Sequence, residues 1–243
     1  PVLGVVSEII CVFARKPLFG YKTMVYTTFM VGILSMVVWA HHQFVAGIDP
    51  RMASIFSLTT IIISIPVAVI MFGMIATMYK GSIDFKVPML WAVGVIVEFL
   101  LGGVTGIYLG SSALDVYFHD TYFVIAHFHY TLIPLVAFGG FALFTYYFPK
   151  VTGRMLDEKL GRIHFWGTAI AFNFVFIPLF FSGMAGEHRR IYDYSGFAEL
   201  ATPGMLKLRV MATHALLVML VFQIPFIINI VKSLLKGAPA GAN

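Results

Sequence analysis

Seven apolar stretches separated by short polar connections constrain this chain more than any other feature of its sequence. They fall at about 1–14, 24–44, 54–79, 89–110, 122–148, 164–183 and 208–235. Each stretch except the first is long enough for a helix to cross the roughly 30 Å hydrocarbon core of a bilayer. The sequence therefore predicts an all-α, polytopic transmembrane helical bundle with six full spans and one partial N-terminal helix.

The composition agrees with a membrane protein. Hydrophobic residues make up 60% of the chain and charged residues 11%, against roughly 25% charged in ordinary soluble domains. The basic residues lie in the connections, without the clustering that nucleic-acid binding requires. A single cysteine, Cys11, excludes an internal disulfide and any thiolate-bridged copper pair within this chain. We expect residues 1–243 to form a single transmembrane domain in contact with lipid.

The distribution of Lys and Arg predicts the orientation of the bundle. If the connection after the first stretch is inside, alternation places these basic residues on the same side: Arg15, Lys16, Lys22, Lys80, Lys86, Lys150, Arg154, Lys159, Arg162, Lys232 and Lys236. The other side keeps Arg51, Arg189, Arg190, Lys207 and Arg209. Because inner loops are enriched in positive charge, the histidine-bearing segments are expected to meet near the outer surface.

Two histidines near the start of the fifth span, His127 and His129, are about 200° apart on a helix. One metal ion cannot use both, whereas a helix between two iron centres could give one axial imidazole to each. The alternative is a pair of buried histidines bonded to neighbouring backbone. Inside a membrane span, an ionisable side chain is costly and is by default a functional candidate.

A second histidine pair, His41 and His42, ends the second span. Adjacent residues on a helix are about 100° apart, so both imidazoles could bind one metal ion from the same side. Ligation by imidazole suits copper or zinc, and a third ligand would have to come from elsewhere. The alternative is an interfacial histidine pair that binds no metal.

Charged residues accompany these histidines in the outer connections. Arg189 and Arg190 could bind carboxylates such as haem propionates in a bidentate way. The alternative is that their side chains only extend to the membrane–water interface. Asp115, His119 and Asp120 offer groups to propionates or to Mg²⁺, unless they form a solvated acidic loop.

Four motifs together resemble subunit I of the haem–copper oxidases, of the cytochrome c oxidase type. They are Trp39–His42, Leu114–Tyr122, Ala126–Tyr130 and Gly186–Arg190. The resemblance covers nearly the whole chain and corresponds to the C-terminal half of the family's subunit, from the end of its sixth helix through its twelfth. It implies copper B and two haems of the haem a type, one low-spin and one high-spin, together with Mg²⁺.

The resemblance also implies a role for each candidate residue. His41 and His42 would bind copper B, His127 the iron of the high-spin haem and His129 the iron of the low-spin haem. His41, His42 and His127 would thus form the catalytic site. Asp115, Arg189 and Arg190 would address the propionates, and His119 and Asp120 the Mg²⁺ region.

The implied function is reduction of O₂ to water coupled to proton translocation, with electrons from cytochrome c delivered through a partner subunit. The family's remaining metal ligands would lie before Pro1, so we expect a polypeptide carrying the N-terminal half of subunit I, together with subunits II and III. The expected location is a bacterial cytoplasmic or mitochondrial inner membrane. The alternatives are a quinol oxidase of the same superfamily and a non-catalytic membrane assembly subunit.

One departure from the family concerns proton input. Val67 and Ile70 occupy positions where the common pattern has a threonine and a lysine. Glu98 lies in the next span at a depth similar to that of Ile70. We hypothesise that Glu98, with Ser64 and Thr60, supplies a proton path instead. The alternative is a protonated glutamic acid bonded to a backbone carbonyl.

Overall fold

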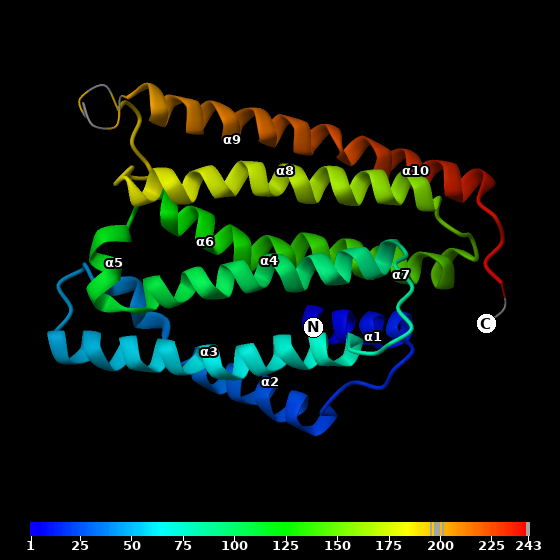
Figure 1. Cartoon of the computed structure of the whole chain (residues 1–243), viewed down its shortest axis with the longest axis horizontal. Helices are drawn as coiled ribbons and strands as arrows, with labels where there is room; N and C mark the ends of the chain where they lie inside the picture. Colours follow the sequence, from blue (N-terminus) through cyan, green and yellow to red (C-terminus); the bar gives the residue numbers. More distant parts are fainter. Residues whose placement is uncertain (195, 197–199, 201, 242–243) are drawn as a thin grey trace.

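The structure is a computed structural model, and it describes residues 1–194, 196, 200 and 202–241. The described chain is helical (Figure 1), and its elements are α1 (Val2–Ala14), α2 (Tyr21–Ser35), the 3₁₀ helix η1 (Trp39–Gln43), α3 (Pro50–Met78), α4 (Val87–Gly110), α5 (Ser112–Phe118), α6 (Tyr122–Ile133), the π-helix η2 (Pro134–Phe138), α7 (Gly139–Thr152), α8 (Glu158–Met184), α9 (Pro203–Val221) and α10 (Gln223–Lys236).

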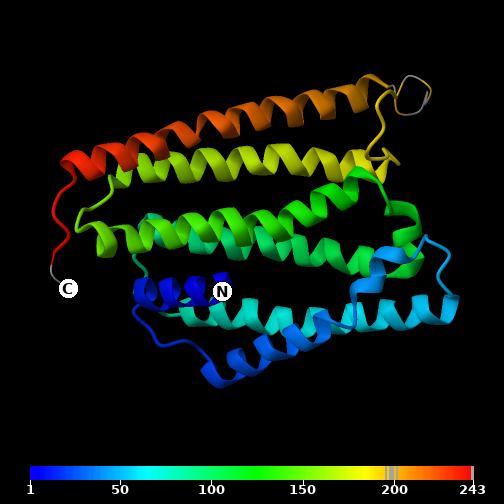
Figure 2. The same cartoon turned by 180° about the vertical axis from the view of Figure 1, so that it is seen from behind.

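The prediction of an all-α bundle is confirmed. In the described residues, six helical segments are long and apolar enough to cross a membrane, and the shorter apolar helix α1 precedes them. The long helices run along one common direction, with α9 and α10 covering one side of the bundle and α2 the other (Figures 1 and 2). Because their side chains are apolar around most of the helix surface, burial in lipid is the environment that suits them.

Three spans are less regular than the periodicity predicts. The second ends in the 3₁₀ helix η1, and the fifth changes to π-helical geometry at Pro134 before it continues as α7. Proline has no backbone N–H to donate, so the local hydrogen-bond register shifts there. The last span is divided at Phe222 into α9 and α10. The expected loop after Gly110 contains the short helix α5.

Helix α4 is the central helix of the fold. It contacts α1, α3, α6, α7 and α8, and it carries the buried Trp91, whose ring packs against Phe138 and Phe165. Gly102 lets α6 approach closely, since a Cβ at this position would lie 2.7 Å from the Tyr130 carbonyl oxygen. The path of α6 across α4 determines where its histidines lie.

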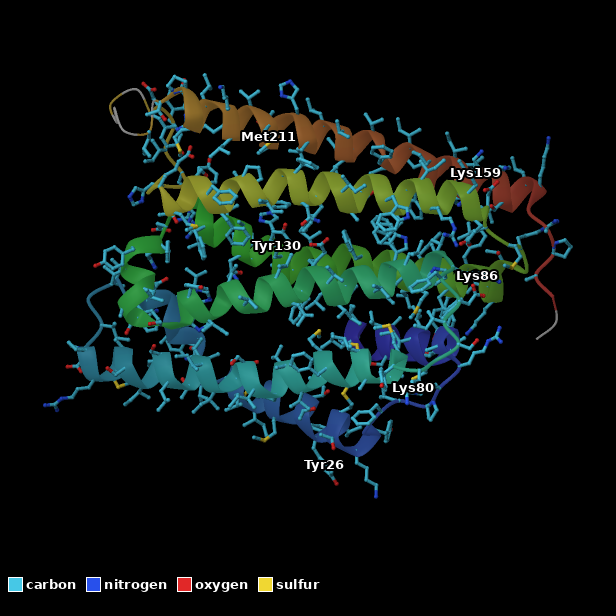
Figure 3. All side chains as sticks on the ribbon, viewed as in Figure 1. Tyr26, Lys80, Lys86, Tyr130, Lys159 and Met211 are labelled. Carbon is cyan, nitrogen blue, oxygen red and sulfur yellow. The ribbon has the colours of Figure 1, made fainter. Side chains whose placement is uncertain are left out.

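The connections alternate between the two ends of the bundle. Those after α1, α3 and α7 lie at one end with the C-terminal tail, and those after η1, α4 and α8 lie at the other (Figures 1 and 2). Lys80, Lys86 and Lys159 all lie at the first end (Figure 3). This agrees with the alternation used to assign the basic residues, while the orientation in a membrane stays a prediction.

Candidate cofactor site

A cavity of about 850 Å³ lies between α3, α4 and α6 at the end of the bundle opposite Lys80 and Lys86. This volume is within the range of about 300–1,000 Å³ that is usual for cofactor and ligand sites. Ten of the predicted site residues line it: His41, His42, Thr60, Ser64, Asp115, His119, Asp120, His127, Arg189 and Arg190. His129 and Glu98 do not line it. The cavity therefore unites residues from separate segments of the chain.

The His41–His42 pair lies on η1, where successive residues are about 120° apart rather than 100°. The two Nε2 atoms are 3.0 Å apart. The Thr60 hydroxyl donates to the Phe56 carbonyl (2.6 Å), so its oxygen can accept from Nδ1 of His41, 3.1 Å away. In that arrangement Nε2 of His41 keeps its lone pair. Two imidazole nitrogens bound to one metal at about 2.0 Å and at right angles are about 2.8 Å apart, so the pair fits one metal ion.

The imidazole of His127 is oriented by α4. Its Nδ1 lies 3.0 Å from the Gly102 carbonyl oxygen and 3.1 Å from the Thr105 hydroxyl. Because a carbonyl only accepts, Nδ1 carries the proton and Nε2 keeps a lone pair, as in metal-binding histidines that donate their other N–H to the backbone. Gly106 leaves room for the ring, since a Cβ there would lie 2.9 Å from the ring carbon Cε1.

His129 lies against a different helix. Its Nδ1 donates to the Ile125 carbonyl (2.7 Å), which leaves Nε2 free in the same way. The ring stacks between Phe128 and Phe176 of α8, with centroid distances of 4.4 and 4.3 Å. The imidazoles of His127 and His129 thus contact α4 and α8 respectively, an arrangement that matches their predicted separation of about 200° around α6.

The outer connections bring the charged candidates together. Nδ1 of His119 donates to Oδ2 of the buried Asp115 (3.0 Å). Burial raises the pKa of the Asp115 carboxyl, and the hydrogen bond from His119 opposes this. Arg189 donates to Oδ1 of Asp120 through two nitrogens, at 2.8 and 2.6 Å, and this guanidinium holds the pKa of Asp120 below its usual value. The segments before α6 and after α8 are therefore joined by an ion pair.

The predicted magnesium residues are near each other, with Nε2 of His119 3.9 Å from Oδ2 of Asp120. Across residues 1–194, 196, 200 and 202–241, no three His, Cys, Asp or Glu side chains form a complete metal-binding group. His41 and His42 are likewise two ligands. The described residues thus offer pairs of donor groups and single imidazoles.

Glu187 and Arg209 belong to this end of the bundle but were missed by the sequence analysis. Glu187 is 0% exposed, and its Oε1 accepts from Nε of Arg209 on α9. The Glu187 carbonyl also accepts from the backbone N–H of Tyr122 at the start of α6 (2.9 Å). The sequence did contain a signal for this ion pair: an acidic residue, Glu187, stands beside an arginine pair, and a further arginine, Arg209, stands at the start of the next span.

Glu98 lies outside the cavity and bonds to a residue that the sequence analysis did not consider. The side chain is 5% exposed, and its Oε1 accepts from Nδ2 of Asn173 on α8 (2.7 Å). Its partner is thus a side-chain amide and not a backbone carbonyl. The hydroxyls of Ser64 and Thr60 donate to carbonyls of their own helix, both at 2.6 Å.

The fold and this site define a class: a polytopic helical membrane protein with an imidazole-lined cavity at one end of the bundle. A family model described as Cytochrome C and Quinol oxidase polypeptide I matches residues 1–218. The chain belongs to the cytochrome c and quinol oxidase polypeptide I family, and the resemblance inferred from the motifs is confirmed. The family implies haem and copper, and the donor atoms and cavity described above fit them.

Curated relatives include both kinds of oxidase. The chain is 46% identical over 237 residues to cytochrome c oxidase subunit 1 of Corynebacterium diphtheriae, an alignment covering 98% of this chain and 41% of that protein. It is 48% identical over 194 residues to quinol oxidase subunit 1 of Bacillus subtilis, covering 80% of this chain and 30% of that protein. The chain therefore spans 41% and 30% of the length of these two relatives.

The fold also matches a solved structure. A heme–copper terminal oxidase dimer determined by cryo-EM has a TM-score of 0.79 to this chain at 20% sequence identity. The match covers 94% of this chain and 44% of that one. At this identity the likeness shows the fold alone.

Proposed function

We propose that this chain is part of the catalytic subunit of a proton-translocating respiratory terminal oxidase that reduces O₂ to water. The observation that carries the proposal is the convergence of His41, His42 and His127 on one cavity, with His129 directed to another helix. Family membership gives the chemical context in which such imidazoles are metal ligands.

His41 and His42 would hold copper B through their Nε2 atoms, and Thr60 would keep the His41 ring in the required tautomer. His127 would hold the iron of the high-spin haem, with Gly102 and Thr105 fixing the ring. These three histidines form the proposed catalytic group. Haem and copper, when bound, supply the electron transfer to oxygen, whereas the chain orients the ligands and limits access of water.

His129 would hold the iron of the low-spin haem, with its imidazole kept in place by stacking against Phe128 and Phe176. At the outer end, Arg189 and Arg190 would bind haem propionates as cations, with Asp115 in the same region. His119 and Asp120 would contribute to a Mg²⁺ site, since carboxylate oxygens suit this ion.

Proton delivery is proposed to use Thr60, Ser64 and Glu98. Both residues line the cavity, and the Thr60 hydroxyl lies 3.1 Å from Nδ1 of His41. Glu98 is the acidic residue buried in the middle of α4. Its hydrogen bond goes to α8, so Glu98 would carry protons through the part of the core behind the cavity.

The proposed electron donor is cytochrome c, acting through a partner subunit, since cytochrome c oxidase subunit 1 proteins match nearly the whole chain. Quinol is the alternative that the Bacillus subtilis relative supports. The further metal ligands are proposed to come from the N-terminal half of subunit I, and subunits II and III to complete the complex. The setting would be an energy-transducing membrane, and the haems of the haem a type.

Purified complex carrying this chain should show a haem reduced-minus-oxidised optical spectrum, a carbon monoxide-binding haem and copper by metal analysis. His127→Ala should abolish carbon monoxide binding, and His129→Ala should remove the low-spin haem signal. His214→Ala is the matched control for His129, because Nδ1 of His214 makes the same bond to the carbonyl four residues earlier, at 2.8 Å, on the exposed face of α9. Haem-free wild-type complex would refute the proposal.

A further inference from the structure

A buried hydrogen-bonded triad joins three helices behind the cavity. The Tyr130 hydroxyl of α6 donates to Oδ1 of Asn173 on α8 (2.7 Å), and Nδ2 of Asn173 donates to Oε1 of Glu98 on α4 (2.7 Å). Tyr130, which lies between α6 and α8 in Figure 3, is fully buried. The amide of Asn173 thus has its oxygen and its nitrogen directed to two different helices.

Glu98 has the surroundings of a neutral acid. In the described part of the chain it has no ion pair, and its second oxygen, Oε2, has no hydrogen-bond partner. An ionised carboxylate buried with one neutral donor and no cation would lose several kcal/mol of hydration. A proton on Oε2 removes this penalty, and Oε1 still accepts from Asn173. Without positive charge nearby, the geometry therefore favours a carboxylic acid at this depth.

In the described residues, the hydrogen bond of Glu98 goes to the amide of Asn173 and not to a titratable group. Tyr130 is the titratable group that faces it from α6, and its proton is already donated to Asn173. Helix α8 also buries a titratable group, His164, which is bonded to Gln223 of α10 (3.0 Å). The remaining buried core around this part of α4 is apolar, with residues such as Phe138 from η2 and Phe172 from α8. Glu98 is therefore the carboxyl group available to bind a proton in this part of the core.

The triad adjoins both candidate iron-binding histidines. Tyr130 directly follows His129 in α6, and Gly102, whose carbonyl holds His127, lies one turn of α4 beyond Glu98. Negative charge arriving near either imidazole would favour the neutral acid, and loss of that charge would favour the carboxylate. The electrostatic coupling needs no movement of the backbone.

We propose that Glu98 is a redox-linked proton-binding site, held in place by Asn173 and Tyr130. This inference rests on the proposed function. When electrons enter the neighbouring haems, a proton from the aqueous phase binds to Oε2 of Glu98. When they leave, the O–H bond breaks and the same proton returns to water, so charge balances without another reactant.

Redox-difference infrared spectroscopy of the purified complex tests the proposal. Wild type should show a carboxylic acid C=O stretching signal that changes with the redox state of the haems and shifts in D₂O. Glu98→Gln should lack it, whereas Glu8→Gln, at an exposed carboxylate near Lys150, should keep it. Asn173→Leu retains Glu98 and should move the signal to higher frequency, because the hydrogen bond to Oε1 is lost.

A normal haem spectrum with identical infrared differences in wild type and Glu98→Gln would overturn the proposal and leave the oxidase function intact. Absence of a haem spectrum in wild type would refute the oxidase function and this inference together. If Glu98→Gln does not assemble, the Asn173→Leu frequency decides: an unchanged carboxylic acid signal in that variant overturns the proposal, and a shifted one supports it.

Discussion

Replacing Arg209 by methionine should destabilise the outer end of the bundle by leaving Glu187 buried without a cation. Glu187 is 0% exposed and the Arg209 side chain 26% exposed. Oε1 of Glu187 accepts from Arg209, and Oε2 has no hydrogen-bond partner in the described residues. Removing the guanidinium therefore leaves the carboxylate without a side-chain partner in an enclosed environment.

Breaking a buried ion pair by removing one partner costs about 3–5 kcal/mol. Because Arg209 is a quarter exposed, water can reach part of the vacated space, and the loss should be near the lower end, about 3 kcal/mol. Changing both residues, in Glu187→Gln with Arg209→Met, leaves a buried amide instead of a charge. An unsatisfied neutral group costs about 1–3 kcal/mol, so the double variant should be no less stable than Arg209→Met alone.

The assay is thermal melting of the purified complex in detergent, monitored by near-ultraviolet circular dichroism at fixed protein and lipid concentrations. The double variant should melt above the Arg209→Met single variant, although it carries one more substitution. If Arg209→Met melts like wild type, or if the double variant loses the sum of the two single losses, Glu187 is not held by this ion pair and the reasoning fails.

Three further outcomes follow from the geometry. Gly106→Ala should impair carbon monoxide binding, since its Cβ would lie 2.9 Å from the His127 ring, whereas Gly140→Ala on α7, where a Cβ would meet nothing within 4 Å, should not. Gly183→Ala should prevent stable assembly, measured as yield of folded complex, because its Cβ would lie 2.0 Å from a backbone nitrogen of α6. The neighbouring Arg189 guanidinium lowers the pKa of Asp120 in the folded chain. The ionised Asp120 therefore stabilises the fold fully above the ordinary pKa of 3.8, and this contribution is lost as the pH falls through the lower folded-state pKa. When the pH is lowered through that range, the melting temperature of Asp120→Asn should fall less than that of the wild type.

The sequence was sufficient for the spans because hydrophobic length is a local property, and a bilayer fixes how much of it is needed. It was also sufficient for the separation of His127 and His129, since helical periodicity is local too. The change at Pro134 comes from a proline, which hydrophobic periodicity does not take into account. The break at Phe222 and the helix α5 are likewise not reported by periodicity. Family membership follows from motifs that are contiguous in sequence.

The site was less accessible to sequence analysis where partners come from distant segments. Asn173 lies 75 residues from Glu98 along the chain, and a single asparagine in a span gives no indication of its partner. Ser64 and Thr60 were natural candidates because their helix precedes that of Glu98, yet the hydrogen bond of Glu98 goes to α8. Similarly, the Glu187–Arg209 pair joins a loop to a later span, and only the fold shows it to be buried.

The small residues of α4 explain why close helix packing and ligand orientation occur together. Gly102 removes the side chain that would keep α6 away, and the carbonyl it leaves accessible accepts from Nδ1 of His127. One turn later, Gly106 leaves space for the imidazole, while Thr105 adds a second oxygen to the same nitrogen. A helix with larger residues at these positions would hold α6 farther away and lose the acceptor that fixes the His127 tautomer. The orientation of this imidazole is therefore a consequence of backbone proximity, which a substitution elsewhere in the cavity could not restore.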